Sequence, residues 1–484
     1  MMKKILLLTP LALLSACVSG PDFEAPAPPP SEAGYGQEGP SRAELGEGPD
    51  LQWWKAFGSD QLDALVDRAL QRNHSLAASK ATLESARERI AAIAGKRLPQ
   101  VDVNARADYE QVNLSAIGLS DRLSAAGIGN PEFDLYTVGG GVSYDLDLFG
   151  RNRRALEQAT AQAEAQQRKT EAAHLVIAGR VVAQVLAIAA LNDRIATEQS
   201  LLDEGERNVA LTESRRRAGA GTLVEVLSAQ GQLASDRTAL PGLEQQLAEG
   251  RAMLAVLLGI SPAELGPTDF SLNDFALPEQ VPVALPSMLV HQRPDILEAE
   301  ARLHAATAAV GVATADLYPD ITLGASFTQS TSEPDKIASG RYSAFDLFAG
   351  LTAPIFHGGT LKARKRGAEA DARAAAETYQ QVVLEAFGQV SGLLSAMETD
   401  GKALSAQQEA ADVAERSLHL SRRSFQVGNS GILQVLDASR SYHRAKLALV
   451  EARTQQYYNV ARLFVATAGG WTEGVDKDDG GPSS

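Results

Sequence analysis

The sequence of 484 residues has few of the residue patterns on which enzymes and nucleic-acid-binding proteins depend. Its seven histidines show no metal-ligand spacing, and it contains neither a Gly-rich phosphate loop nor a nucleophile elbow. We therefore predict no catalytic residue, no metal site and no cofactor. The net charge of −15 opposes binding to nucleic acid, whose phosphates require a basic surface.

Aromatic residues and long hydrophobic runs are also scarce. Aromatic residues make up 5% of the chain and alanine is plentiful, which suits closely packed helices better than a bulky core. Beyond the N-terminal segment we find no run of eighteen apolar residues, and this argues against a helical membrane protein.

Residues 1–16 have the pattern of a secretory signal peptide, in which Lys3 and Lys4 precede an apolar stretch and small residues follow. The only cysteine, Cys17, comes directly after Leu14-Ser15-Ala16, and this tetrapeptide resembles the bacterial lipobox. The resemblance implies cleavage before Cys17 and acylation of its thiol. Two or more acyl chains are enough for stable anchoring in a membrane. The alternative is a free cysteine within a discarded signal peptide.

Two segments have compositions typical of unfolded chain. Residues 17–50 are rich in Pro, Gly, Ser and Glu, and we expect them to form an acylated tether and not a domain. Residues 471–484 are predicted to be disordered.

The rest of the chain contains one pattern twice. A strand motif that ends at Phe149 recurs with its end at Phe356, and a Gly-rich turn at Gly219 recurs at Gly428. A period this long excludes short-repeat solenoids and points to a pseudo-symmetric fold. We predict a first repeat over residues 51–285 and a second over residues 286–470.

Each repeat contains two segments in which apolar and polar residues alternate, as in a strand with one wet face. The predicted strands are residues 101–109, 138–148, 321–328 and 345–355. Phe348 breaks the pattern because it falls on the polar face of the last segment. Each strand is about as long as a tilted transmembrane strand.

The alternative for these strands is an ordinary antiparallel sheet on a soluble core. Four strands in a membrane would leave two open edges, which lipid does not tolerate. Closure would therefore need several chains, each of which adds four strands.

Each pair of strands is followed by a predicted helical hairpin. The hairpins cover residues 150–258 and 359–468, and a segment over residues 259–285 follows the first. The first arm has no proline and would be about 100 Å long. We expect Pro241-Gly242 to kink the second arm, because proline removes a hydrogen bond of the helix.

The turns of the hairpins carry recognisable local signals. We expect Gly219 and Gly221 to adopt left-handed conformations at a helix end. Thr222 and Glu225 have the spacing of a capping box, and Gly431 occupies the place of Thr222 in the second copy. These residues form turns in any case, so the question is whether they also contact a partner.

Taken together with Trp53-Trp54-Lys-Ala-Phe57 and residues 293–300, these features resemble the TolC-like outer-membrane efflux ducts, in the lipoprotein branch that serves resistance-nodulation-division type multidrug pumps. The resemblance covers roughly residues 17–471. It implies a mostly α fold with a small transmembrane β-barrel. In such a fold three chains form a homotrimer, twelve strands close one barrel, and the helices form a periplasmic tunnel.

The resemblance also implies where the functional residues lie. Leu433 and Asp437, one helical turn apart, would line the periplasmic gate, whereas a core leucine and a solvated aspartate are the alternative. The small, exposed hairpin tips are expected to dock a periplasmic adaptor, or membrane fusion protein. The tip residues are Gly219, Gly221, Thr222, Gly428 and Gly431.

The implied function is that of the outer-membrane channel of a tripartite efflux system. Such a channel would passively export small molecules such as drugs, and its partners would be the adaptor, an inner-membrane pump and outer-membrane lipid. One alternative is an outer-membrane duct for type I protein secretion. Another is a lipid-anchored long-helix scaffold or adhesin without a pore.

Overall fold

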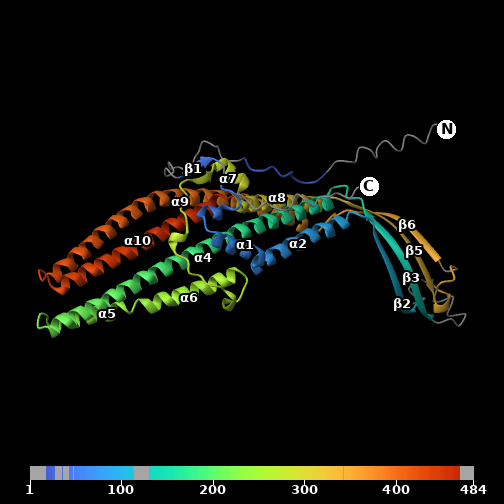
Figure 1. Ribbon diagram of the computed structural model, residues 1–484. Helices are drawn as coiled ribbons and strands as arrows, with labels where there is room; N and C mark the ends of the chain where they lie inside the picture. The colour runs from blue at the N-terminus through green and yellow to red at the C-terminus, as the bar shows by residue number, and fades with distance from the viewer. Residues whose placement is uncertain are drawn as a thin grey trace, which may run out of the picture. The chain divides into compact units, whose positions relative to one another are not determined.

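The computed structural model is mostly helical, with one four-stranded and one two-stranded sheet among the residues that it describes (Figure 1). The described residues are 18–27, 35, 43–46, 48–113, 130–341 and 343–468. The predicted signal peptide, Cys17 and the predicted disordered tail over residues 471–484 therefore lie outside the described part.

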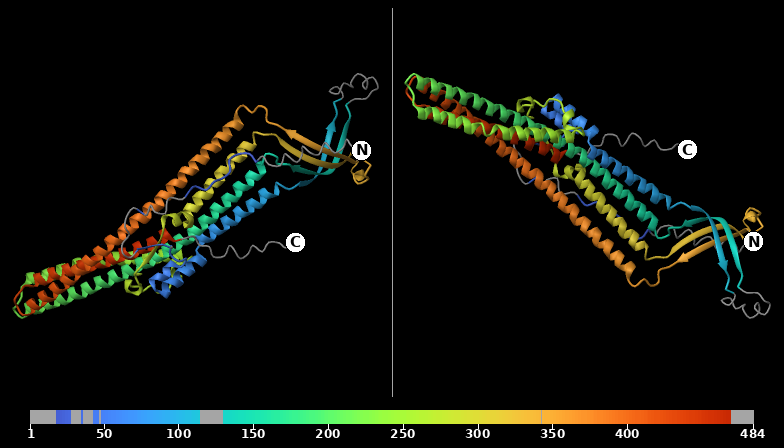
Figure 2. Two further views of the ribbon diagram at one scale, coloured as in Figure 1. Left: turned by 90° about the horizontal axis from the view of Figure 1, so that it is seen from above. Right: turned by 90° about the horizontal axis from the view of Figure 1, so that it is seen from below.

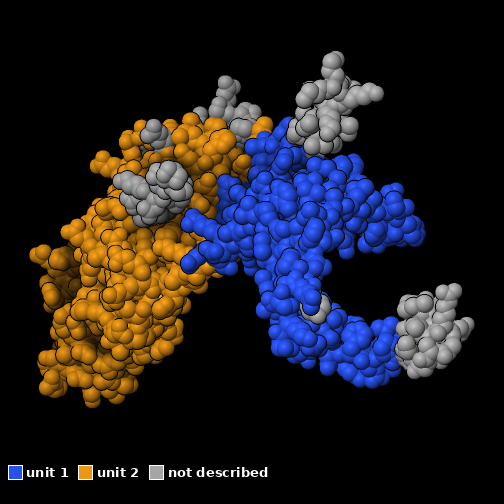
Figure 3. Space-filling model, turned by 90° about the vertical axis from the view of Figure 1, so that its right-hand side faces the viewer, with its two compact units in different colours: residues 1–25, 84–164, 301–377 blue, residues 26–83, 165–300, 378–484 orange. Residues whose placement is uncertain are grey.

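The chain divides into two compact units, which Figure 3 shows in different colours. Each unit takes residues from both sequence repeats, so the repeats themselves are not the compact units. Unit 1 comprises Met1–Ala25, Glu84–Glu164 and Ala301–Glu377. Unit 2 comprises Pro26–Leu83, Ala165–Glu300 and Thr378–Ser484.

Unit 1 contains an antiparallel sheet with the strand order β2-β3-β5-β6 (Figure 2). The strands are β2 (Gln100–Gln111), β3 (Glu132–Asp145), β5 (Asp320–Thr331) and β6 (Ser343–Thr352). β3 begins earlier than the sequence pattern predicted, because Leu135 pairs with Asp108 on the polar face and breaks the alternation. β6 ends before residue 355, since Pro354 has no N–H to donate to a neighbouring strand.

The strand register separates an apolar face of the sheet from a polar one. Residues directly opposite each other in antiparallel strands point to the same face. One row across the sheet is Val101, Val142, Ala325 and Leu347, and the next row is Asp102, Gly141, Ser326 and Asp346. The apolar face is open to the surroundings, with Val103 81% and Phe345 80% exposed.

Phe348 lies on the polar face, as the alternation predicted. It is opposite Gly324 in the register, and its ring occupies the space in which a side chain at position 324 would stand. The aromatic side chain is therefore accommodated by a glycine on the neighbouring strand.

The helices repeat in length between the two halves of the chain. α2 (His74–Gly95) and α8 (Pro294–Ala315) each have 22 residues and precede β2 and β5. α4 (Arg151–Arg217) and α9 (Thr360–Gln426) each have 67 residues and follow β3 and β6. The duplication thus extends to the helix that precedes each pair of strands.

Two helical hairpins end in unit 2. α4 returns through α5 (Leu223–Asp236) and α6 (Leu240–Leu257), whereas α9 returns through the single helix α10 (Ile432–Thr467). The predicted kink at Pro241 is a break between α5 and α6. Pro241 lies in the first turn of α6, where its missing N–H would have no partner within the helix.

Contrary to the expectation from the sequence, α4 contains an 18-residue window with a mean hydropathy of 1.9, and by length and composition it could cross a membrane. Half of that window is buried inside the protein. Val181, Val185 and Ile188 of α4 are completely buried in the core of unit 2. The apolar character of α4 is therefore explained by helix packing.

The core of unit 2 also holds the tryptophan motif. Trp53, Trp54 and Phe57 of the 3-10 helix η3 (Trp53–Phe57) are buried, and the ring of Trp53 stacks on Phe464 of α10 at 5.5 Å. η3 is followed by α1 (Asp60–Arg72), whose Leu62 is also completely buried. These residues pack η3 against α10 within the core of unit 2.

The segment over residues 259–285 and the predicted tether also contribute to unit 2. Residues 259–285 contain two short 3-10 helices, η4 (Pro262–Glu264) and η5 (Leu272–Asp274), and strand β4 (Val281–Ala284). β1 (Ala43–Gly46) pairs with β4 in parallel, and the buried Tyr35 donates a hydrogen bond of 2.6 Å to the carbonyl of Ala284. The predicted tether is therefore fixed to unit 2 at these points. After β4 follows α7 (Pro286–Gln292), which precedes α8.

Candidate functional site at the hairpin turns

The two hairpin turns share one backbone conformation. Gly219 after α4 and Gly428 after α9 have φ angles of 75° and 84°, which are left-handed. The following residues donate equivalent hydrogen bonds of 2.9 Å, from Ala220 N to Arg215 O and from Asn429 N to Ser424 O. This is the Schellman arrangement, which satisfies carbonyls at the end of a helix. The prediction for Gly219 is therefore confirmed.

Gly221 does not have the left-handed conformation that the sequence suggested, because this arrangement requires only one such residue. Its role is to permit a close approach. A Cβ atom at this position would lie 3.2 Å from the backbone nitrogen of Arg216 and 3.2 Å from a carboxylate oxygen of Glu225.

The two turns differ in how the next helix begins. Thr222 caps α5: its hydroxyl accepts from Glu225 N at 3.3 Å, and Glu225 Oε2 accepts from Thr222 N at 2.7 Å. The predicted capping box is therefore confirmed. Gly431 takes the equivalent position before α10 but has no side chain to cap it. The first N–H groups of α10 are therefore less well satisfied than those of α5.

The ends of the two hairpins lie side by side and pack together (Figure 2). Arg215 of α4 donates a hydrogen bond of 3.1 Å to the carbonyl of Phe425, and its guanidinium lies 4.5 Å from the centroid of the Phe425 ring. A small apolar cluster continues this contact along α5, α9 and α10. Its buried members are Ala229, Leu418, Phe425, Ile432, Val435, Leu436 and Ala438.

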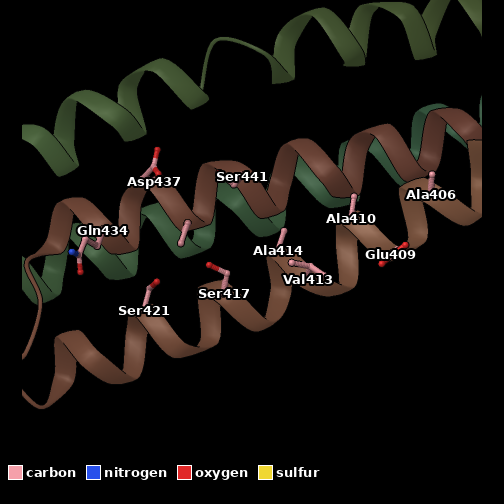
Figure 4. Close-up of a pocket in the computed structure, with 11 residues that line it drawn as sticks. Ala406, Glu409, Ala410, Val413, Ala414, Ser417, Ser421, Gln434, Asp437 and Ser441 are labelled. Atoms are coloured by element: carbon pink, nitrogen blue, oxygen red, sulfur yellow. The ribbon is translucent and has the colours of Figure 1, made fainter.

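Leu433 and Asp437 lie on the exposed face of α10, opposite this cluster. Leu433 is 60% exposed. Asp437 lines an open groove of about 780 Å³ between α9 and α10, whose other residues are mostly Ala and Ser (Figure 4). Within the described residues the Asp437 carboxylate has no recorded hydrogen bond or ion pair. The core interpretation of Leu433 is therefore wrong, and both side chains are available to meet another molecule.

Further large apolar side chains are exposed close to the turns. They are Leu223, Val224 and Leu227 on α5 and Val427 after α9, with exposed fractions between 50% and 70%. Exposed apolar side chains gathered in one region mark an interaction surface more often than isolated ones do.

A buried polar cluster links α4, α9 and α10 behind the turns, and the sequence did not predict it. Glu204 of α4, 7% exposed, accepts a hydrogen bond of 3.0 Å from the Ser439 hydroxyl. Its other oxygen lies 3.4 Å from Nε2 of His443, and Arg422 forms an ion pair with the same carboxylate. The four residues are separated by up to 239 positions and follow no motif, so only the fold brings them together.

Opposing effects act on the pKa of Glu204. Burial raises it, whereas hydrogen bonds from His443, Arg422 and Ser439 and the charge of Arg422 lower it, with the net result a pKa of about 2. The carboxylate is therefore held in its charged form by its partners.

The described residues contain no group of three or more His, Cys, Asp or Glu side chains that could hold a metal ion. The structure gathers the described site residues at the packed ends of the two hairpins. Gly219, Gly221 and Thr222 form one turn and Gly428 and Gly431 the other, whereas Leu433 and Asp437 lie on the first turns of α10.

Comparison with known proteins shows extensive similarity. A family model described as "Outer membrane efflux protein" matches residues 65–260 and 285–469. The pyoverdine export outer membrane protein OpmQ of Pseudomonas aeruginosa is 32% identical over 472 residues, which cover 97% of each chain. The probable outer membrane lipoprotein SilC of Salmonella typhimurium is 26% identical over 97% of this chain and 99% of its own.

Solved structures show the same fold. The outer-membrane channel OprN is 28% identical and superposes with a TM-score of 0.85, over 94% of this chain and all of the OprN chain.

Proposed function

Because the chain belongs to the family of outer membrane efflux proteins, we propose that it works as a homotrimer with a periplasmic adaptor and an inner-membrane pump. The predicted family, fold class, outer-membrane location and role as an efflux channel are confirmed by these similarities. The family is one of channels, so we assign no catalytic role to the chain. We propose small molecules as its cargo.

The main structural support for this proposal is the sheet of unit 1, with its two different faces and its two open edges. One of its faces is apolar and exposed, and the other is lined by Asp102, Asn104, Ser326 and Thr328. In a membrane barrel lipid contacts the apolar face and water contacts the polar one. β2 and β6 form the edges of this sheet, and their unpaired backbone groups would be satisfied by the edges of neighbouring chains.

We propose that Asp437 and Leu433 form the constriction of the closed channel. Their exposure on one face of α10 supports this assignment, because within the described residues neither side chain is buried and no hydrogen bond or ion pair holds the Asp437 carboxylate. Three chains would bring three Asp437 carboxylates into one ring, and acidic rings favour cations over anions. Leu433, one turn away, would supply apolar side chains beside this ring.

The proposed function is tested by conductance in planar bilayers. The unaltered protein should form cation-selective channels. The variant Leu433→Ala with Asp437→Ser should conduct several times better and prefer cations less. Leu420→Ala with Asp412→Ser, two exposed residues of α9, is the matched control and should behave like the unaltered protein.

Three results would contradict parts of the proposal. An unaltered protein that forms no channels would favour a scaffold or adhesin without a pore. Unchanged conductance in the double variant would place the constriction elsewhere, with Leu223 and Leu227 of the other hairpin as the next candidates. A channel that passes unfolded polypeptide would favour type I protein secretion over efflux.

We also propose that the hairpin tips dock the adaptor. The exposed apolar residues Leu223, Val224 and Val427 support this, as does the open space that a Cβ atom would enter at Gly219 or Gly428. Gly219→Trp should abolish export without loss of the trimer. Gly219→Asn tolerates the left-handed conformation and stays small, so it separates backbone strain from steric block. Normal export by Gly219→Trp would leave the turns with no docking role.

We propose that Cys17 carries the lipid anchor, a proposal supported by the lipobox and by the name of the lipoprotein relative SilC. Cells that express Cys17→Ser should incorporate no radioactive palmitate into the protein. Labelling of this variant equal to that of the unaltered chain would exclude Cys17 as the acylated residue.

A further inference from the structure

A pocket of about 280 Å³ lies in unit 1 where the strands meet the long helices. It is formed by the start of α4, the end of α8 and the segment between β6 and α9. Phe149 and Tyr318 stack in its wall, with ring centroids 4.7 Å apart and planes 10° apart. His357 and Arg364 also line it. The pocket therefore combines a flat aromatic wall with hydrogen-bond donors.

The acidic residues of the pocket are already engaged. Asp147 accepts hydrogen bonds of 2.9 Å from the backbone N–H groups of Asn152 and Arg153. Asp316 forms an ion pair of 2.8 Å with Arg151. Neither carboxylate is therefore paired with Arg364 or His357, although Asp147 keeps its negative charge.

Arg364 and His357 are the pocket's remaining basic side chains. The third acid of the pocket, Asp320, interacts electrostatically with Asp145 and Arg151. In the described part of the chain, no ion pair or hydrogen bond is found for the Arg364 guanidinium or the His357 ring. Both side chains can therefore donate hydrogen bonds to an anionic group.

The pocket opens in a basic region of an acidic protein. Four of the five residues over positions 362–366 are Lys or Arg, although the chain as a whole carries a net charge of −15. Lys365 lies 3.7 Å from Glu369, whereas Lys362 and Arg366 are exposed. Ile355 and Phe356, six residues before the start of this basic stretch, are 90% and 86% exposed. Exposed apolar residues beside cations are typical of a membrane interface.

We propose that this junction pocket binds the headgroup of an anionic glycerophospholipid. The proposal rests on the proposed function, which puts the apolar face of the sheet in the membrane. The pocket then lies at the helix-side border of that membrane, at the level of the phosphate groups. Arg364 and His357 donate to the phosphate, Phe149 and Tyr318 contact the glycerol region, and Lys362 and Arg366 favour a net negative headgroup.

The test measures phosphatidylglycerol binding to the purified, delipidated full chain in a nonionic detergent, by native mass spectrometry. The variant Arg364→Gln with His357→Gln should bind this lipid about tenfold more weakly than the unaltered protein. The control Arg373→Gln removes an exposed cation of α9 outside the pocket and should have no effect. Phosphatidylcholine, which has no net charge, should bind more weakly than phosphatidylglycerol.

Two results would overturn the assignment. One is equal binding of phosphatidylglycerol by the double variant and the unaltered protein. The other is equal binding of both lipids by the unaltered protein, which would indicate a non-selective annulus. Conductance measured on the same preparations keeps the two proposals apart. If channels form and lipid binding does not depend on Arg364, only the lipid site fails, whereas absence of channels counts against the proposed function.

Discussion

At the scale of single residues, the environment of Glu204 differs strongly from that of a solvated carboxylate. Its partners come from two other helices: Ser439 and His443 are buried, whereas the Arg422 side chain is 42% exposed. Loss of the charged acceptor therefore weakens mainly the hydrogen bonds made to it. We predict that Glu204→Gln lowers the stability of the hairpin end by about 1.5–3 kcal/mol at neutral pH. Thermal unfolding followed by circular dichroism measures this change.

Glu206→Gln is the matched control. Glu206 is on the same helix, but its ion pair with Arg237 is exposed on both sides, and such pairs contribute about 0–1 kcal/mol. Equal destabilisation by the two substitutions would show that the buried cluster has no special role.

The pKa of Glu204 predicts how the stability of the folded protein changes with pH. The pKa of Glu204 in the folded protein, about 2, lies below the usual 4.5, so this carboxylate stabilises the fold above pH 4.5. The stabilisation is lost as the pH falls from about 4.5 to about 2. The unaltered protein should therefore lose more stability over this range than Glu204→Gln. Parallel curves for the two proteins would contradict the assigned pKa.

At the scale of secondary-structure elements, we expect an arginine to destabilise the sheet more on its apolar face than on its polar face. Val103 is on the apolar face, 81% exposed, and Asn104 is its neighbour on the polar face. If the apolar face contacts lipid, Val103→Arg should cost about 2–4 kcal/mol near the middle of the bilayer. Asn104→Arg should be mild because water contacts its face. Urea unfolding in lipid vesicles compares the two variants, and equal tolerance would indicate a soluble sheet.

The sequence predicted the elements well where a single period governs the pattern. Alternation located the four strands, and the proline-free stretch located α4. Prediction failed where the period breaks: Leu135 on the polar face hid the first residues of β3. The anchoring of the predicted tether was also missed, because Tyr35 and β1 are held by partners about 240 residues away in the sequence.

The features of the candidate site also fall into those that the sequence could predict and those that it could not. The glycine turns and the Thr222 cap depend on neighbouring residues and could be predicted, apart from the conformation of Gly221. The cluster around Glu204 could not, since its members have ordinary helical contexts and meet only through long-range packing. Turns and helix caps can be predicted from one sequence because neighbouring residues determine them. Contacts between residues of distant helices can be identified only once the fold is known.

At the scale of the whole molecule, the number of strands restricts the number of chains. One chain offers four strands with two open edges, β2 and β6. Two chains would give a barrel of eight strands, whose interior is just wide enough for side chains. A channel for solutes therefore needs at least three chains. With four strands from each chain, the next barrel above eight strands has twelve strands from three chains.

We therefore predict that native mass spectrometry of the detergent-extracted protein gives three times the mass of the mature chain. Closure of the barrel should stabilise this trimer, because every backbone group at the edges of β2 and β6 then has a partner. Gel electrophoresis without heating should show a band that heating converts to the monomer. Val103→Arg should reduce this band, and Asn104→Arg should leave it intact. A mass of two chains would contradict the barrel, and a trimer that survives equally in both variants would have to be held by its helices instead.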